Sequence, residues 1–577
     1  MNRSGFFPSL VLLFLFAVKS HAALDVGKPL WGFDGKVPGS SFALLSVEVA
    51  NRSASAFEGD IELSSSGSGA APLKQSVFLA PGTSRVVQFH PYTGNFAPDW
   101  KLSWNDGRER DADMGQPETG APATVILADP DAPGMRAVRM KLFSENLFPT
   151  TVGATDGLGA VVLDHQPRWD APRREAFLDW LRRGGTVHLL PGADGAAVQF
   201  TDDFTSLNIT DGGTQKRIGA GLVVKQETTR AEITEQWLKD HGFAPREVRN
   251  DGKGNIYDVD SFIFRKLAAI TRPNINWNLI YLLTIAYVIL IGPVFYLQRK
   301  RNYRLLLGGF LVTVGLFAWA FTVIGRRGYG EKQIYHSIAI AHPLGEGRFD
   351  VQEWIHAFAT TGDIYRFTHG DSVHLYGTAS EGDTVRGEIH EGKGAQFTAD
   401  IPLFSSRPFL HRGVMKAEDL ALKVTEWTPE GQSTLKSVRV TIAPECRKRV
   451  FAAAIEHKGR YREVRIGDDG ICLNPEARWL DAQDFCKTDN FNNYGYGNYY
   501  GDAETVVNEL RALHPFLIGL ENCEPTVARK YLTRPAQDEN RARLFLYADA
   551  PPGFAMKNDR FESGRSLVLY VADIFKP

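Results

Sequence analysis

The chain has 577 residues, a length typical of about four domains. Its 65 Lys and Arg residues nearly balance its 67 Asp and Glu residues, so the formal net charge is −2 and the composition gives no support for a nucleic acid partner. Apolar residues make up 43% of the chain and glycine is plentiful, which fits folded, β-rich domains rather than a disordered protein.

The start of the chain, residues 1–22, has the pattern of a secretory signal peptide. Arg3 supplies a positive charge, Leu10–Val18 is a short apolar run, and Ser20-His21-Ala22 provides the small residues that a signal peptidase reads. An uncleaved membrane anchor is the alternative, but the apolar run is too short to span a bilayer comfortably. We therefore predict a mature chain that begins near Ala23, outside the cytoplasm.

Residues 24–107 predict an immunoglobulin-like β-sandwich. Apolar and polar side chains alternate over residues 44–50 and 57–63, as in half-buried strands, and Pro81-Gly82 separates two further apolar segments in the manner of a hairpin turn. A module of this kind usually acts as a spacer or binds other proteins. The polar stretch 108–121 that follows predicts a linker.

Residues 122–270 predict an α/β domain with a flavodoxin-like sheet. Short, fully apolar strands are expected at Thr124–Ala128, Ala160–Leu163 and Thr186–Leu190. Between the second and third of these strands, Asp170 is a suitable N-cap for a helix. Apolar strands that alternate with a helix are typical of a parallel sheet covered on both faces.

The segment Val161–Gly192 resembles class I glutamine amidotransferase-like domains, in which a strand ending in Asp is followed by a helix, Arg-Arg-Gly-Gly-Thr and a strand ending in Pro-Gly. Gly292–Leu297, with the basic residues after it, is similar to uncharacterised bacterial membrane proteins that join such a domain to two transmembrane helices. Catalytic members of this fold use a cysteine at a strand-turn-helix elbow. This chain has no cysteine before Cys446 and carries Pro191-Gly192-Ala193 at the elbow, so the resemblance implies a catalytically dead descendant that binds or scaffolds.

Polar residues follow two of the predicted α/β strands, namely Asp129, Asp131, Asp164 and His165. Ligands of open α/β sheets bind outside the carboxyl ends of strands, so we expect these side chains at one edge of the sheet. Carboxylates and an imidazole can hold a divalent metal or act as acid and base. The alternative is that Asp follows strands because it suits turns and helix caps. No full catalytic constellation can be assembled, so we predict ligand-binding candidates, with no catalytic residue, metal or cofactor.

Two apolar runs, 277–297 and 305–325, predict a transmembrane hairpin, since each has the length of about twenty residues that a spanning helix needs. Neither run contains a charged residue, whereas transport normally requires such groups inside the membrane, so we predict an anchor or assembly surface. By the positive-inside rule, the loop 298–304 is cytoplasmic. Its cations are Arg299, Lys300, Arg301 and Arg304.

Residues 331–577 predict a β-rich, sandwich-like domain, because short strands alternate with turn residues. All four cysteines lie in this region, and an even number in one domain is typical of disulfides in an oxidising compartment. Cys472 and Cys486 are close in sequence and form one candidate pair, which leaves Cys446 with Cys523, although spacing does not fix the connectivity. A zinc site is the alternative, but the chain lacks a Cys-x-x-Cys motif and a histidine at ligand spacing.

Residues 491–501 are rich in Tyr, Gly and Asn. Such a composition makes adaptable contact surfaces, as in antibody loops, and suits a glycan or a partner protein. The alternative is a low-complexity loop. The tyrosines concerned are Tyr494, Tyr496, Tyr499 and Tyr500.

Together these features predict a multidomain α+β protein of the bacterial inner membrane, with its N- and C-terminal domains in the periplasm. We predict a non-enzymatic protein whose periplasmic domains bind or scaffold partners in the cell envelope. One alternative is an envelope hydrolase that acts through Asp129, Asp164 and His165. Another is a sensor that binds a metal or small ligand in a pocket at the same strand ends.

Overall fold

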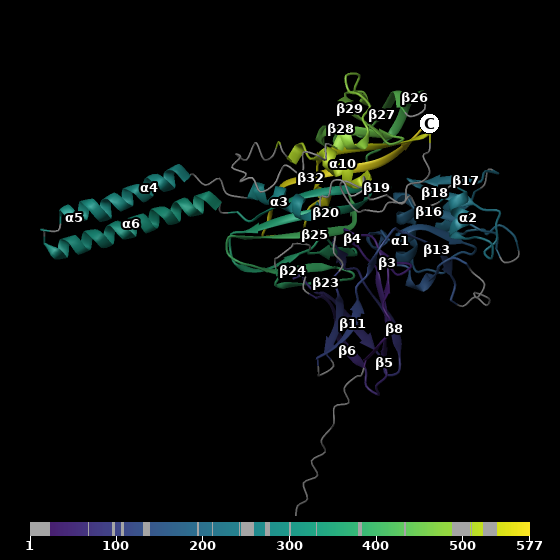
Figure 1. The fold of residues 1–577 in the computed structure, drawn as a ribbon, viewed down its shortest axis with the longest axis horizontal. Coiled ribbons are helices and arrows are strands. Elements are labelled where there is room, and N and C mark those ends of the chain that lie inside the picture. Colours follow the sequence, from purple (N-terminus) through teal and green to yellow (C-terminus); the bar gives the residue numbers. More distant parts are fainter. Residues whose placement is uncertain are drawn as a thin grey trace, which may run out of the picture.

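The structure is a computed structural model that describes most of the chain. It has a mixed α/β fold that is rich in strands, which confirms the coarse fold class predicted from the sequence (Figure 1). The predicted signal peptide lies outside the described residues. These residues are 24–66, 69–94, 98–105, 109–130, 139–192, 195–209, 212–241, 243, 259–271, 277–298, 300, 302–329, 332–378, 384–431, 434–486, 508, 510–522 and 539–577.

A seven-stranded sheet joins the region before the apolar hairpin to the region after it. Its order is β11-β10-β6-β7-β23-β24-β21. At the junction β7 and β23 run parallel, with Leu73 opposite Ile389 and Lys74 opposite His390. The two regions, which the sequence suggests as separate domains, therefore share one sheet. The strands are β6 (Phe57–Ser65), β7 (Leu73–Leu79), β10 (Trp100–Asn105), β11 (Glu109–Gly115), β21 (Asp363–Phe367), β23 (Gly387–His390) and β24 (Gln396–Ile401).

A shared hydrophobic core supports this junction. Ile61 and Leu63 on β6 belong to the same buried cluster as Phe367 and Phe397 on the later strands. Alternate residues of each strand point to this core, and the other face is mostly polar, with Phe78 and Ile364 as exposed apolar side chains. The remaining N-terminal strands form a second sheet, of order β1-β5-β2 with β8 beside β5, and two short pairs, β3 with β12 and β4 with β9. Their bounds are β1 (Leu24–Val26), β2 (Leu30–Trp31), β3 (Lys36–Val37), β4 (Ser41–Phe42), β5 (Leu45–Asn51), β8 (Ser84–Phe89), β9 (Tyr92–Thr93) and β12 (Glu118–Thr119).

The structure corrects the prediction that residues 108–121 form a linker. Its first half forms β11, an edge strand paired antiparallel with β10, and Glu118–Thr119 pairs with β3. An edge strand needs few inward apolar residues, and here Met114 is buried while Ala112 packs against the core. The charged residues beside them, Arg110, Asp111 and Asp113, face solvent, so the segment has the composition of a linker while it completes a sheet.

The α/β region forms a six-stranded sheet of order β14-β13-β15-β16-β18-β17, in which only the edge strand β17 is antiparallel. Helix α1 begins after Asp170, whose side chain accepts a hydrogen bond from the Arg173 amide, and ends at Gly184 with a φ of 131°. The three predicted strands and this helix are confirmed. The elements are β13 (Ala123–Ala128), β14 (Leu142–Ser144), η1 (Glu145–Leu147), η2 (Val152–Ala154), β15 (Leu158–Leu163), α1 (Ala171–Arg183), β16 (Thr186–Leu189), η3 (Asp202–Leu207), β17 (Gln215–Ile218), β18 (Gly221–Lys225) and α2 (Glu235–Asp240).

The region after the hairpin is dominated by an eleven-stranded sheet of order β22-β25-β20-β19-β32-β31-β28-β29-β30-β27-β26. Its central strands are long and almost entirely buried, because modules pack on both faces. The elements are β19 (Ile334–Gly345), β20 (Arg348–Ala359), β22 (His374–Gly377), β25 (Ser405–Lys416), β26 (Lys423–Glu430), β27 (Thr434–Thr441), α7 (Pro444–Arg449), β28 (Val450–His457), β29 (Arg460–Gly467), β30 (Gly470–Leu473), α8 (Ala482–Cys486), α10 (His514–Asn522), β31 (Arg541–Asp549), η6 (Pro552–Phe554) and β32 (Glu562–Phe575).

The apolar hairpin projects away from the sheets (Figure 1). Its segments Asn278–Leu297 and Tyr303–Ile324 are long and apolar enough to cross a membrane, and neither is buried inside the described part of the protein. The first contains a π-helical turn at Pro293, which has no amide hydrogen to donate to a regular helix. The helical elements are α3 (Val259–Thr271), α4 (Trp277–Ile289), η4 (Leu290–Val294), α5 (Phe295–Leu297) and α6 (Tyr303–Tyr329).

Both ends of the hairpin connect to the large sheet at the same end of its interior strands β19 and β20. On the entry side, the Thr271 hydroxyl lies 3.4 Å from Nδ1 of His356 on β20. On the exit side, Gln333 donates a hydrogen bond of 2.8 Å to the Thr361 hydroxyl, just beyond β20. The hairpin is therefore inserted at one end of strands β19 and β20, within a structure that continues on both sides of it in the sequence.

A buried ion network attaches the α/β region to the large sheet. Arg183 of α1 contacts Asp350 of β20 and Asp156 at 2.8 Å each, and Arg412 of β25 pairs with the same two carboxylates. Although burial alone would raise it, these guanidinium groups hold the pKa of Asp350 far below its usual range. Breaking one partner of a buried pair leaves an uncompensated charge, so this network fixes how the two regions meet.

The pairing of β7 with β23 predicts a crosslink across the hairpin. Cysteines introduced as Lys74→Cys and His390→Cys occupy directly opposed positions on adjacent strands, about 5 Å apart, within disulfide range. We expect oxidation to join the two halves of a full chain cleaved at a protease site inserted after Lys300, as seen on a non-reducing gel.

Two controls accompany this crosslink. Lys74→Cys alone tests pairing with the native cysteines, and Lys101→Cys with His390→Cys places the thiols three strands apart. Joined halves in either control, or separated halves in the test pair, would contradict the shared sheet.

Candidate functional sites

The predicted strand-end residues lie where a parallel sheet brings them. β13 and β15 are adjacent and parallel, so Asp129 and Asp164, which follow them, belong to the same edge of the sheet. His165 comes directly after Asp164. Asp131 lies outside the described residues. The structure therefore confirms the shared edge for three of the four candidates.

His165 is held between two carboxylates. Its Nδ1 lies 2.7 Å from Oδ1 of Asp164, and its Nε2 lies 3.2 Å from Oε2 of Glu145. The other oxygen of Asp164 accepts a hydrogen bond of 2.8 Å from Arg230. Glu145 and Arg230 complete the cluster. No sequence pattern singles them out, because they lie on a short 3₁₀ turn and in a polar loop.

The charges of this cluster neutralise one another. Burial disfavours the charged imidazole, but the hydrogen bonds to Asp164 and Glu145 raise the pKa of His165 to about 9. The same hydrogen bond and Arg230 lower the pKa of Asp164 despite its burial. An imidazolium whose two nitrogens both donate is a poor general base, and a carboxylate shared by two cations is a poor metal ligand. The geometry favours a structural ion cluster over a catalytic site.

The raised pKa of His165 predicts a pH-dependent stability. Because the folded-state pKa lies above the unfolded value of about 6.5, the contribution is fully present below pH ~6.5 and is lost as the pH rises through about 9. Its size is on the order of 3 kcal/mol at most. We expect the thermal midpoint of the full chain in detergent to fall across this window.

The His165→Gln variant should show a lower midpoint at pH 6 and a flatter profile from pH 6.5 to 9. His241→Gln, which changes an exposed histidine on the same region, serves as the matched control. Parallel profiles for the native chain and His165→Gln would show that the imidazolium is not stabilised by its neighbours.

A second titratable cluster is buried between the large sheet and the seven-stranded sheet. Oε2 of Glu353 lies 3.1 Å from Nδ1 of His411 and 3.3 Å from Nε2 of His369. Nε2 of His411 lies 3.0 Å from Nδ1 of His374, and Nδ1 of His369 lies 2.9 Å from the Tyr376 hydroxyl. The groups thus form a continuous chain of polar contacts.

The local sequence allows this close approach because Gly413 lies opposite His374. A Cβ atom at Gly413 would be 2.3 Å from Nδ1 of His374, so a larger residue would displace the imidazole. Burial, with His369 nearby, lowers the pKa of His374 to about 4 and that of His411 well below 6.5. Both rings are therefore neutral at physiological pH.

Glu353, His369 and His411 form the group of potential metal ligands found among the described residues, with ligand atoms within 4.8 Å of one another. Imidazole binds a metal in the plane of its ring. Here the rings of His369 and His411 are stacked, with centroids 3.5 Å apart and planes 11° apart, so their lone pairs do not converge. A metal would have to separate the rings, and the present arrangement is a buried hydrogen-bonded cluster. The pattern Thr368-His369-Gly370-Asp371-Ser372-Val373-His374 was the available sequence clue.

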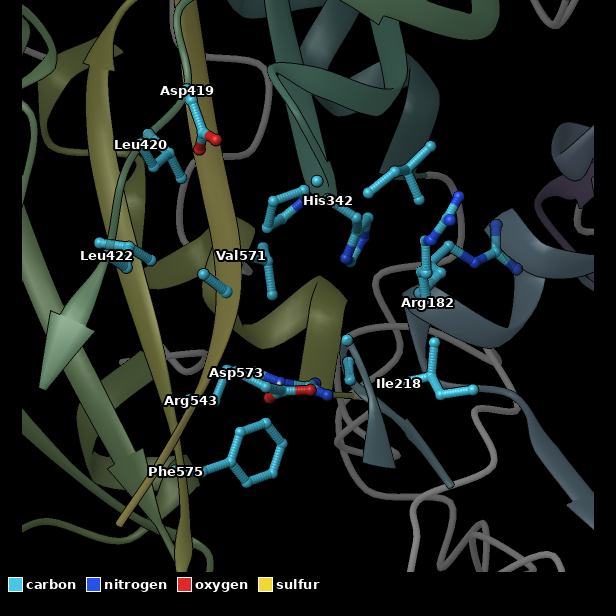
Figure 2. Close-up of a pocket in the computed structure, with 17 residues that line it drawn as sticks. Arg182, Ile218, His342, Asp419, Leu420, Leu422, Arg543, Val571, Asp573 and Phe575 are labelled. Atoms are coloured by element: carbon cyan, nitrogen blue, oxygen red, sulfur yellow. Dashed lines mark hydrogen bonds and ion pairs between the residues drawn. The ribbon is translucent and has the colours of Figure 1, made fainter. Parts of the chain in front are cut away.

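A cavity of about 410 Å³ lies between the α/β region and the large sheet (Figure 2). Arg182 and Ile218 face it from the α/β side, and Arg543, Asp573 and Phe575 face it from β31 and β32. Its walls include the β17–β18 turn, which precedes β18, so it lies at the opposite end of the sheet from Asp164. The pocket that a sensor would need is therefore present at a different place from the predicted one.

The remaining predicted residues stay partly untested. Cys446 and Cys472 carry free thiols in the structure, and burial raises the pKa of the Cys446 thiol. The side chain of Cys486 and all of Cys523 lie outside the described residues, so the disulfide pairing remains a prediction. Arg299, Arg301 and the tyrosine-rich segment also lie outside them, whereas Lys300 and Arg304 are exposed.

No family model matches the chain, and no curated protein matches it. Among solved structures, a cycloisomaltooligosaccharide glucanotransferase of Paenibacillus sp. is 7% identical, with 79% of this chain and 98% of that chain covered and a TM-score of 0.15. A β-glucuronidase from glycoside hydrolase family 2 is 9% identical, with coverages of 96% and 62% and a TM-score of 0.12. These scores are too low to indicate a shared fold.

Proposed function

We propose that the chain is a non-enzymatic, multi-pass protein of the bacterial inner membrane whose periplasmic part binds or scaffolds partners of the cell envelope. The observation that carries this proposal is the parallel pairing of β7 with β23. Strands before and after the hairpin can pair only if both lie on one side of a membrane that the hairpin enters. Two spans satisfy that condition, and the cations around Lys300 favour a cytoplasmic tip.

The chemistry of the strand-end cluster supports the interpretation that the α/β region has no catalytic role. Asp164 and His165 are engaged by Arg230 and Glu145, and the segment after β16 carries Pro191-Gly192 where an amidotransferase-like enzyme would have its elbow. In this proposal the region is a catalytically dead, amidotransferase-like module. Its role is to present a surface held rigidly against the large sheet by Arg183 and Arg412.

The cavity of Figure 2 favours a second candidate, a sensor of a small ligand. Its volume falls within the range of about 300–1,000 Å³ that ligand sites occupy, and it lies between two modules. A ligand there would contact both the α/β region and β32. It would therefore change how firmly the modules are joined.

The orientation can be tested with alkaline phosphatase, which is active only outside the cytoplasm. Fusions after Gly192 and after Pro577 should be active, and a fusion after Lys300 should be inactive, because the hairpin tip is cytoplasmic in the proposed topology. The reverse pattern would overturn the periplasmic assignment, and mixed activity at the first two sites would overturn the shared sheet.

Scaffolding and hydrolysis can be separated with the triple variant Asp129→Ala, Asp164→Ala and His165→Ala, expressed in cells that lack the native chain. A scaffold keeps its crosslinked partners and the growth phenotype of the native protein, because none of these side chains is needed for contact. Loss of phenotype, with the cross-hairpin disulfide still forming, would favour the hydrolase. The disulfide reports that the seven-stranded sheet has formed, and the thermal midpoint of the variant in detergent reports whether the α/β region has folded.

A further inference from the structure

Three apolar side chains are exposed together at one corner of the described structure. Ile364 is 65% exposed, Leu403 60% and Phe404 39%. Ile364 is on β21, where it pairs with Asp400 at the end of β24, and Leu403 and Phe404 lie in the turn that follows β24. A Cβ atom placed on Gly362, just before β21, would be 3.1 Å from the Leu403 amide, so the two turns are in contact. We call these three residues the apolar tip.

The apolar tip lies next to the point where the chain leaves helix α6. Gln333, four residues beyond the end of α6, donates hydrogen bonds to the Thr361 hydroxyl at 2.8 Å and to the Tyr365 hydroxyl at 3.2 Å. Thr361 and Tyr365 flank Gly362 and Ile364. Hydrogen bonds therefore lead from Gln333, which follows the hairpin in the chain, to the residues that flank the tip.

The strand register sets the direction in which the tip points. Ile334, at the start of β19, pairs with Phe358, and Ala359 pairs with Ser405, so β19, β20 and β25 stop at one level. The turns at 360–362 and 402–404 extend past that level, toward the incoming α6. Figure 1 shows β20, β24 and β25 turning back on the side from which α4 and α6 project.

The depth of the tip follows from helix geometry. The apolar span of α6 ends at Ile324 and the helix continues to Tyr329, which adds about 7–8 Å at a rise of about 1.5 Å per residue. The headgroup layer on each side of a bilayer is about 5–8 Å thick. Four residues separate Tyr329 from Ile334 at the start of β19, so the sheet begins a short distance beyond the headgroups, and the turns at 360–362 and 402–404 reach back toward that layer.

The surroundings of the tip have the character of an interfacial surface. Arg560 pairs with Asp363, and Lys332 pairs with Glu562 at 2.9 Å, so exposed ion pairs border the apolar side chains. Phe404 has a φ of 53°, in the left-handed region that non-glycine residues rarely adopt. The turn thus keeps an unfavourable backbone conformation at Phe404 itself, whose side chain is partly in solvent.

We propose that Ile364, Leu403 and Phe404 insert into the lipid headgroup layer and form a third attachment to the membrane beside the two helices. This inference rests on the proposed membrane-spanning function and deepens it. The occupant of the surface is the bilayer itself, because the tip is adjacent to a spanning helix and at headgroup depth. Insertion fixes the tilt of the sheets relative to the membrane, since two helices alone define only a flexible pivot.

The test uses three matched photocrosslinking variants of the full chain, Phe404→p-benzoylphenylalanine, Phe310→p-benzoylphenylalanine and Phe78→p-benzoylphenylalanine. Each replaces a phenylalanine of the native protein. Phe310 lies within the apolar span of α6, and Phe78 is 60% exposed on β7, far from the hairpin. The proteins are reconstituted into vesicles of phosphatidylethanolamine and phosphatidylglycerol that contain an alkyne-tagged phospholipid, and are then irradiated.

We expect lipid adducts at positions 310 and 404, each several-fold above position 78. Adding Leu403→Asp to the Phe404 variant should lower its lipid adduct several-fold, whereas Val86→Asp, at an exposed valine of β8, should not. Adducts at 310 with only background at 404 would overturn the inference and leave the membrane anchor intact. Background at 310 would overturn the anchor as well. A protein–protein adduct at 404 would show that a second copy, not lipid, covers the tip.

Discussion

The parallel contact between β7 and β23 is the constraint on which the rest of the structure depends. It is short, with only two opposed residue pairs, yet it joins parts of the chain separated by the whole α/β region and the hairpin. The shared core behind it, with Ile61 and Leu63 on one side and Phe367 and Phe397 on the other, makes the pairing stable. Any arrangement that put the two parts on opposite sides of a membrane would expose this core.

Buried charge is used in this protein to join modules rather than to do chemistry. Arg183 and Arg412 share Asp156 and Asp350 across one boundary, and Arg541 and Arg543 share Asp573 beside the cavity. In each case the carboxylates are fully occupied by guanidinium groups, which a point mutation would leave unpaired at a large cost. His165 follows the same rule on the surface of the α/β sheet. Asp164 and His165, which sequence patterns suggest as ligands, are therefore already paired within the chain.

Local patterns predicted the local structure. The Asp170 cap, the short apolar strands and the two apolar runs of the hairpin each depend on neighbours within about 20 residues, where propensity and periodicity are informative. The pairing of β7 with β23 depends on residues more than 300 positions apart, for which a single sequence holds no register information. β11 was missed because an edge strand tolerates the composition of a linker. The cluster of Glu353, His369 and His411 was missed because two strands, β20 and β25, and the loop between β21 and β22 must first be placed side by side.

The position of the hairpin couples it to the most constrained part of the molecule. Its entry leg contacts β20 through His356, and its exit leg leads directly into β19, the neighbour of β20. β20 also carries Asp350, which binds the α/β region, and Glu353, at the centre of the histidine cluster. A displacement of this end of β20 therefore acts on both buried polar networks, because close-packed strands move as a unit. In the proposed membrane topology, the strand that lies nearest the bilayer is also the strand that holds the α/β region through Asp350, so attachment to the bilayer and presentation of that surface depend on the same strand.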